Sequence, residues 1–89
     1  SVKVFPNPVR ETYTGPIAIS GLMGETTVKI TDVSGNLVFE TESFGGQAVW
    51  DGRNFHGQRV ATGTYLVFLA NNAGGQVTDA HVTKILFIH

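Results

Sequence analysis

The 89-residue chain carries a formal net charge of −1, with 42% hydrophobic and 15% charged residues. This balance predicts one globular domain over residues 1–89 and excludes a disordered chain, and the scattered basic residues exclude a nucleic-acid footprint. There is no cysteine and no apolar run of the roughly 20 residues that a membrane helix needs. Because the chain opens directly into a strand pattern, without a methionine or a visible signal peptide, we expect a domain cut from a larger protein.

The N-terminal segment alternates over Val2–Phe5 and then stops at Pro6, Asn7 and Pro8. A proline lacks the backbone donor that a central strand needs. The pattern therefore predicts an edge strand that breaks and bends at these prolines. A loop is expected over Arg10–Gly15.

The middle of the chain predicts short strands separated by turns. Strands are expected over Pro16–Ser20, Thr27–Thr31, Leu37–Thr41 and Gln47–Trp50. Their alternation points four side chains into a core: Ile17, Ile19, Val28 and Ile30. Turn residues at Asp32–Asn36 predict a hairpin, and Gly45–Gly46 predicts another reversal.

The stretch from Val49 to Ala70 organises the rest of the chain. Asp51-Gly52 is a turn dipeptide, and Gly63 opens the longest strand candidate, Thr64–Ala70. Apolar residues at both alternating positions predict that this strand is central and covered on both faces. A hairpin tip over Asn71–Gly75 and a last strand over about Val77–Ile88 follow.

The resulting pattern is seven or eight short strands, turn signals about every ten residues and no helical periodicity. It predicts an all-β fold, an immunoglobulin-like antiparallel β-sandwich of about seven strands. Trp50 is the expected core anchor, and the spacing from Gly63 to Tyr65 resembles a tyrosine corner.

The last strand has apolar residues on both faces, with Ile85 and Phe87 on one side and Leu86 and Ile88 on the other. Either the strand is internal or a partner covers it. An exposed apolar edge here would favour dimerisation or strand swapping. The sequence leaves both readings open.

No cluster in the sequence predicts catalysis, so we expect no enzyme and no catalytic residue. The three histidines lack the close spacing of a zinc site, and Asp51 with Asn54 fits a turn better than a calcium loop. No metal and no cofactor are expected. The strand aromatics are expected in the core rather than on a sugar-binding platform: Phe39, Trp50, Tyr65 and Phe68.

Three features in order resemble the C-terminal sorting domains of the type IX (Por) secretion system. They are VFPNP near the start, VWDGRNFHGQRVATGTYLV in the centre, and Lys84 with its apolar followers at the end. Within that family the sequence most resembles a component of the cell-surface attachment complex that contains the sortase PorU. Immunoglobulin-like domains of flagellar hook-cap proteins carry a central pattern similar to WDG and Gly-x-Tyr.

The resemblance implies a non-enzymatic sandwich domain that the outer-membrane translocon reads as an export signal. It implies passage through the periplasm to the outer-membrane cell surface and contact with the translocon and the sortase attachment complex. Recognition positions carried over from the family are Pro6, Asn7, Pro8, Gly63, Tyr65, Lys84, Ile85, Leu86, Phe87 and Ile88. The alternative is a structural or carbohydrate-binding immunoglobulin-like domain of a surface enzyme or adhesin.

Overall fold

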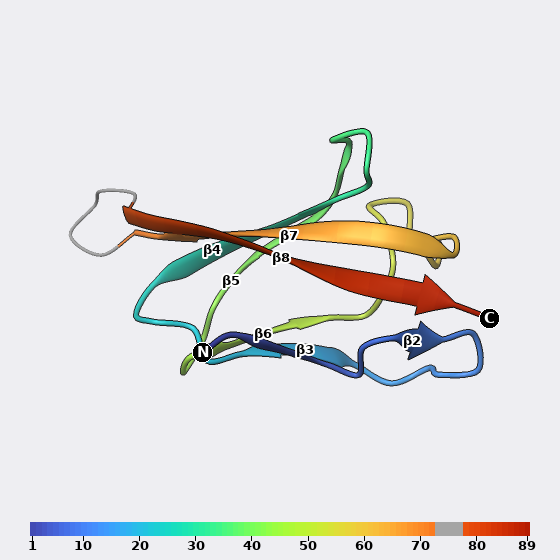
Figure 1. Ribbon diagram of the computed structural model, residues 1–89, viewed down its shortest axis with the longest axis horizontal. Helices are drawn as coiled ribbons and strands as arrows, with labels where there is room; N and C mark the ends of the chain where they lie inside the picture. The colour runs from blue at the N-terminus through green and yellow to red at the C-terminus, as the bar shows by residue number, and fades with distance from the viewer. Residues whose placement is uncertain (73–77) are drawn as a thin grey trace.

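The computed structural model describes residues 1–72 and 78–89, which form two facing β-sheets (Figure 1). The eight strands of this part of the chain are β1 (Lys3–Phe5), β2 (Val9–Arg10), β3 (Ile17–Ser20), β4 (Thr26–Thr31), β5 (Leu37–Glu42), β6 (Gln47–Trp50), β7 (Gly63–Asn71) and β8 (Thr78–Ile88). One sheet has the order β1-β3-β6 and the other β2-β8-β7-β4-β5. The predicted all-β sandwich is confirmed. The described residues include no helix of the length and hydropathy that would cross a membrane.

The chain passes from the small sheet to the large sheet at the Pro-Asn-Pro segment. Before it, β1 pairs antiparallel with β3 at the edge of the small sheet; after it, β2 pairs parallel with β8 in the large sheet. The peptide bonds Phe5–Pro6 and Asn7–Pro8 are both cis. Because β2 includes Arg10, the prediction of a loop over Arg10–Gly15 was wrong at its start. A two-residue strand is too short to show alternation, and its partner lies at the far end of the sequence.

Strands β3 to β6 lie where the sequence predicted them, within one residue at each end. The four aliphatic side chains predicted to point inward are all buried. The hairpin between β4 and β5 is stabilised by Asp32, whose Oδ1 accepts the backbone N–H groups of Ser34 and Asn36, each at 2.9 Å. The hairpin predicted over Asp32–Asn36 is present, and the Asp32 side chain stabilises it.

Strand β7 is central in its sheet, as predicted, because it pairs with β4 on one side and β8 on the other. The prediction that both faces are covered was wrong. Tyr65, Val67 and Leu69 face the core, whereas Phe68 on the opposite face is 40% exposed. The described fold has two layers, so the outer face of each sheet meets solvent even where its side chains are apolar.

The core is built around Trp50, which is fully buried between the sheets. Its ring centroid lies 5.4 Å from that of Phe87, 6.1 Å from that of Tyr65 and 6.0 Å from that of Phe39. The Trp50 Nε1–H donates to the Arg53 carbonyl at 2.9 Å, so the buried indole keeps its hydrogen bond. The prediction of Trp50 as core anchor is confirmed.

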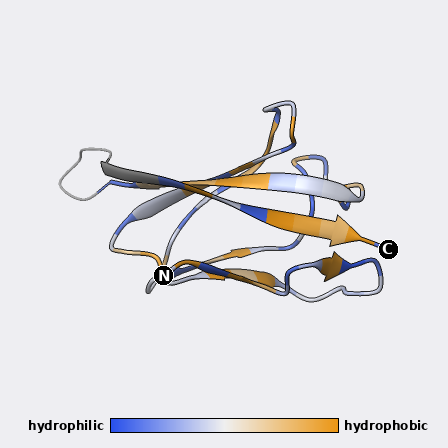
Figure 2. Cartoon of the chain, viewed as in Figure 1, coloured by the Kyte–Doolittle hydropathy of each residue, from blue (hydrophilic) through white to orange (hydrophobic). Residues whose placement is uncertain are grey.

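The predicted tyrosine corner is also present. The Tyr65 hydroxyl donates to the Ala61 carbonyl at 2.7 Å, four residues back along the chain. Figure 2 shows hydrophobic residues at the end of β8 and along β3, where the two sheets face each other. The predicted start of the last strand at Val77 and most of the predicted hairpin tip lie outside the described residues.

Candidate docking surface at the C-terminal strand

The ten positions that the family resemblance singled out come together at one end of the large sheet. Gly63 pairs with Phe87 and Tyr65 pairs with Ile85 across β7 and β8. The Pro-Asn-Pro segment lies against the same part of β8, because the Asn7 side chain bonds to its backbone. Motifs separated by more than fifty residues in sequence therefore form one cluster, next to the C-terminus in Figure 1.

Asn7 uses its whole amide in this contact. Its Nδ2 donates to the Lys84 carbonyl at 3.0 Å, and its Oδ1 accepts the Leu86 backbone N–H at 3.0 Å. Both distances are those of well-formed hydrogen bonds. The sequence marked Asn7 as the residue between two strand-breaking prolines, and the family resemblance marked it as a recognition position. Neither indicated its two hydrogen bonds to β8.

The cluster divides by the alternation of β8. Ile85 and Phe87 point inward with Tyr65 and are buried in the core. Leu86 points outward and is 37% exposed, and Ile88 on the same face is half-buried. A partner of the folded domain would not touch the buried Tyr65, Ile85 and Phe87, which contribute to folding.

The outward members form what we call the C-terminal surface: Asn7, Pro8, Lys84, Leu86 and Ile88. Apart from the half-buried Ile88, each is exposed. The face that carries Leu86 and Ile88 is therefore partly exposed in the isolated domain. An apolar strip beside a lysine is suited to contact with a protein surface.

The last part of β8 is not a free edge, contrary to the reading that favoured dimerisation or strand swapping there. Strand β2 pairs with Phe87 and Ile88, and the Asn7 amide occupies the backbone groups at Lys84 and Leu86. A second strand cannot add to this edge while those bonds are made. The sequence did not indicate this cover because β2 was not predicted.

Arg59 holds β2 and the following loop beside β8, a contact that sequence reasoning missed. Its guanidinium donates to the carbonyls of Arg10 and Tyr13, at 3.0 and 2.9 Å, and lies 5.5 Å from the centroid of the Phe87 ring. Arginine suits this position because one planar group can donate to two carbonyls and stack on an aromatic face. The partners lie 46 and 49 residues away, beyond any local signal.

An ion pair lies next to this contact at the chain end. Nδ1 of His89 is 2.6 Å from Oε2 of Glu11, and both side chains are largely exposed. The hydrogen bond with His89, and then its charge, lower the pKa of Glu11. Because water screens the pair, its contribution to stability is small.

Two glycines are needed at the turns that lead into the cluster. Gly52, in the Trp-Asp-Gly motif, has a φ of 77°, and a Cβ there would lie 3.5 Å from Phe87 and Ile17 side-chain atoms. Gly63 has a φ of 150°, which residues with a side chain rarely adopt. Both positions therefore fit glycine for backbone reasons.

The side chains weighed as metal ligands have other contacts. Oδ1 of Asp51 accepts the Arg53 N–H at 3.0 Å, and Oδ1 of Asn54 accepts the N–H groups of His56 and Gln58 at 2.9 and 3.1 Å. These are the turn-stabilising bonds that the sequence favoured. Among the side chains that the structure describes, in residues 1–72 and 81–89, no group of three or more His, Asp or Glu is placed to hold a metal ion. Metal-free function stays a prediction.

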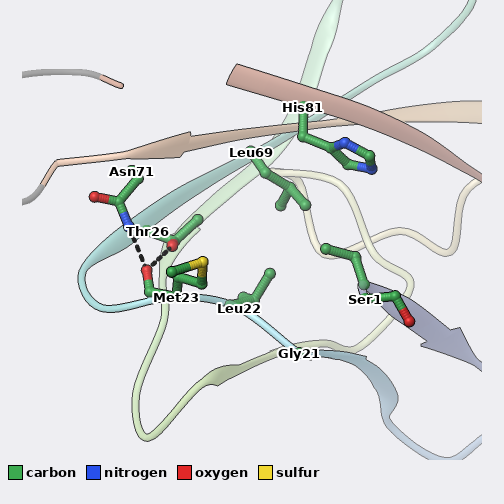
Figure 3. Close-up of a pocket in the computed structure, with 9 residues that line it drawn as sticks. Ser1, Gly21, Leu22, Met23, Thr26, Leu69, Asn71 and His81 are labelled. Carbon is green, nitrogen blue, oxygen red and sulfur yellow. Dashed lines mark hydrogen bonds between the residues drawn. The ribbon is translucent and has the colours of Figure 1, made fainter. Parts of the chain in front are cut away.

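An open pocket of about 570 Å³ lies away from the C-terminal surface, between the start of the chain and the connection from β3 to β4 (Figure 3). Leu22, Leu69 and Met23 contribute its apolar lining. Thr26 and Asn71 both donate to the Met23 carbonyl, as Figure 3 shows, so these polar groups serve the local backbone. The pocket gathers no set of polar groups that would define a ligand.

Comparison with known proteins identifies the family to which this fold belongs. The family model described as the FlgD Ig-like domain matches residues 10–75. The chain belongs to the FlgD Ig-like domain family. The match confirms the immunoglobulin-like character predicted from the sequence, and the matching model is not one for sorting domains.

A solved structure of PorZ from Porphyromonas gingivalis matches the whole chain, with 34% sequence identity and a TM-score of 0.86. PorZ is described as an essential bacterial surface component of the type IX secretion system. The chain spans 12% of the length of the PorZ chain. PorZ is the protein of that secretion system that the sequence most resembled, so the similarity to PorZ is confirmed. No curated protein matches the sequence.

Proposed function

We propose that this domain is a non-enzymatic C-terminal docking and sorting module of type IX secretion. It directs its parent protein through the outer-membrane translocon to the cell surface, in a PorZ-like component of the sortase attachment complex. The observation that carries the proposal is the similarity to PorZ over the full chain, with the sorting-domain motifs gathered in one cluster.

The proposed contact region is the C-terminal surface. Leu86 and Ile88 supply apolar area there, and Lys84 supplies a charge that can favour one partner orientation. The translocon and the PorU-containing attachment complex are the proposed partners. The proposed route runs through the periplasm to the outer-membrane surface.

The test uses a neutral reporter fused ahead of residues 1–89, behind a signal peptide, in a host with type IX secretion. The wild-type fusion is expected at the cell surface. The double variant Leu86→Ser with Ile88→Ser is expected to fold with a small loss of stability, because both side chains are already partly in water, and to fail in surface delivery.

Two control variants separate docking from folding. The pair Leu37→Ser with Val49→Ser removes exposed aliphatic side chains from β5 and β6 and is expected to leave delivery intact. Ile85→Ser is expected to unfold the domain, since it places a hydroxyl and a cavity in the core. If the Leu86 and Ile88 double variant folds and is delivered like wild type, this surface does not dock.

The family match favours one second candidate, a purely structural immunoglobulin-like module of a surface protein. Periplasmic retention of the wild-type fusion would favour it. For carbohydrate binding, Trp50 and Tyr65 are buried in the core and cannot stack on a sugar, whereas Phe68 is a strand aromatic with an exposed side chain.

A further inference from the structure

We infer that Asn7 is a positioning residue whose side-chain amide holds the C-terminal strand in the register that presents Leu86 and Ile88 to a partner. The inference rests on the proposed function, and it assigns the Pro-Asn-Pro segment a task of its own. That task is to complete the outer edge of β8 where no backbone strand can do so.

The register of the large sheet supports this assignment. Val9 pairs with Phe87 and Arg10 with Ile88 in a parallel ladder. Two residues earlier, the same register places position 7 opposite Ile85, which lies between Lys84 and Leu86. In a parallel ladder, a residue bonds to the carbonyl and the amide that flank its opposite residue. The Asn7 amide bonds to those two groups, the Lys84 carbonyl and the Leu86 N–H.

The flanking prolines explain why a side chain is used. Pro6 and Pro8 have no N–H, so the backbone on either side of Asn7 cannot donate to a strand. The side-chain amide carries a donor NH2 group and an acceptor oxygen in a single planar group, so it can present one N–H and one C=O to a strand as the backbone does. Asn7 therefore extends the two-residue pairing of β2 along β8.

We call the two hydrogen bonds from Asn7 to β8 the clamp, and their position connects the clamp to the C-terminal surface. The Leu86 backbone N–H donates to Asn7, and the Leu86 side chain is the more exposed of the two aliphatic side chains of that surface. Beyond it, β2 fixes Ile88. With the clamp lost, Leu86 lies on a strand segment held from one side only, by β7.

The first measurement is residue-specific amide hydrogen exchange on the 89-residue domain. Asn7→Ala is expected to speed exchange of the Leu86 amide about tenfold or more, because that amide loses its acceptor. Exchange at Ile85, which pairs with β7, is expected to stay as in wild type. Asn54→Ala, which removes another side-chain amide that bonds to backbone, is the matched control and should leave Leu86 unchanged.

The second measurement is surface delivery of the reporter fusion. Asn7→Ala is expected to reduce delivery at least about fivefold, because the loss of even one of its two hydrogen bonds changes an equilibrium by about that factor. Ser43→Ala loses two hydrogen bonds to backbone, from the Thr26 N–H and to the Gly24 carbonyl, at a position outside the cluster, and should be delivered like wild type. This second control separates positioning of Leu86 from a general loss of stability.

The outcomes are distinct. Unchanged Leu86 exchange in Asn7→Ala would overturn the clamp while leaving the proposed docking function intact. Faster exchange with full delivery would overturn the positioning role, although the Leu86 and Ile88 double variant could still fail. A wild-type fusion that stays in the periplasm would overturn the proposed function and this role together.

Discussion

Tyr65 offers the sharpest test of the fold, because its ring and its hydroxyl have separate contacts. The ring is buried in the core, with its centroid 5.3 Å from that of Phe87 and 6.1 Å from that of Trp50. The hydroxyl reaches the Ala61 carbonyl at 2.7 Å. Two substitutions can therefore remove the hydrogen bond alone or the bond and the ring together.

Tyr65→Phe removes only the hydroxyl and should lower the free energy of unfolding by about 1 kcal/mol, the net value of a typical hydrogen bond. Tyr65→Ala should lower it by about 4 kcal/mol, because truncation of a buried aromatic side chain costs about 3–5 kcal/mol. For a domain of this size, 1 kcal/mol corresponds to a shift in Tm of about 4–8 °C. The two variants should thus differ clearly in thermal melting.

The measurement is urea unfolding followed by Trp50 fluorescence, with thermal melting as a second probe. Equal m values for Tyr65→Phe and wild type would indicate that only stability changed. If Tyr65→Ala melts like wild type, the placement of β7 in the core is wrong. If Tyr65→Phe loses as much as Tyr65→Ala, the hydroxyl and not the ring packing dominates, and the reasoning from the aromatic cluster fails.

Further expectations concern charge and metal. Arg59→Lys should cost about 1–2 kcal/mol in urea unfolding, because an ammonium cannot keep both carbonyl bonds and the ring contact. The bonds from Asn36 lower the pKa of Asp32 below its ordinary 3.8, so its stabilisation should hold above that pH and be lost as the pH falls further, which acid titration of unfolding would check. Burial raises the pKa of Tyr65 above its ordinary 10.0, so stability should fall as the pH rises beyond 10. Calorimetric titration with zinc or calcium should reveal no site tighter than about 100 µM.

Local signals were enough to predict much of the fold. Alternation over β4 identified Val28 and Ile30 as core residues, since a strand with one wet face must repeat every two residues. The turn at Asp32 and the corner at Tyr65 also depend on residues close in sequence. Such features could be predicted because each is encoded within a few positions.

The features that were missed are long-range or depend on the number of layers. β2 has two residues and a partner 78 positions later, so nothing near Val9 could reveal it. The exposure of Phe68 depends on whether a third layer covers the sheet, which apolar character alone does not tell. The candidate site shares this limit, because the Asn7 contact exists only once the two ends of the chain meet.

Because the two ends of the chain meet, one strand, β8, can contribute both to the core and to the proposed docking surface. Because β8 is internal, its odd residues Ile85 and Phe87 are committed to the core, and its even residues Leu86 and Ile88 remain on the outer face. The strand that precedes the Pro-Asn-Pro segment belongs to the small sheet and the strand that follows it to the large one, so this segment fixes β8 relative to both layers. In the proposed function, a partner of the C-terminal surface would contact the outer face of β8, which exists only once β8 has paired with β2 and β7, so recognition would require a folded domain.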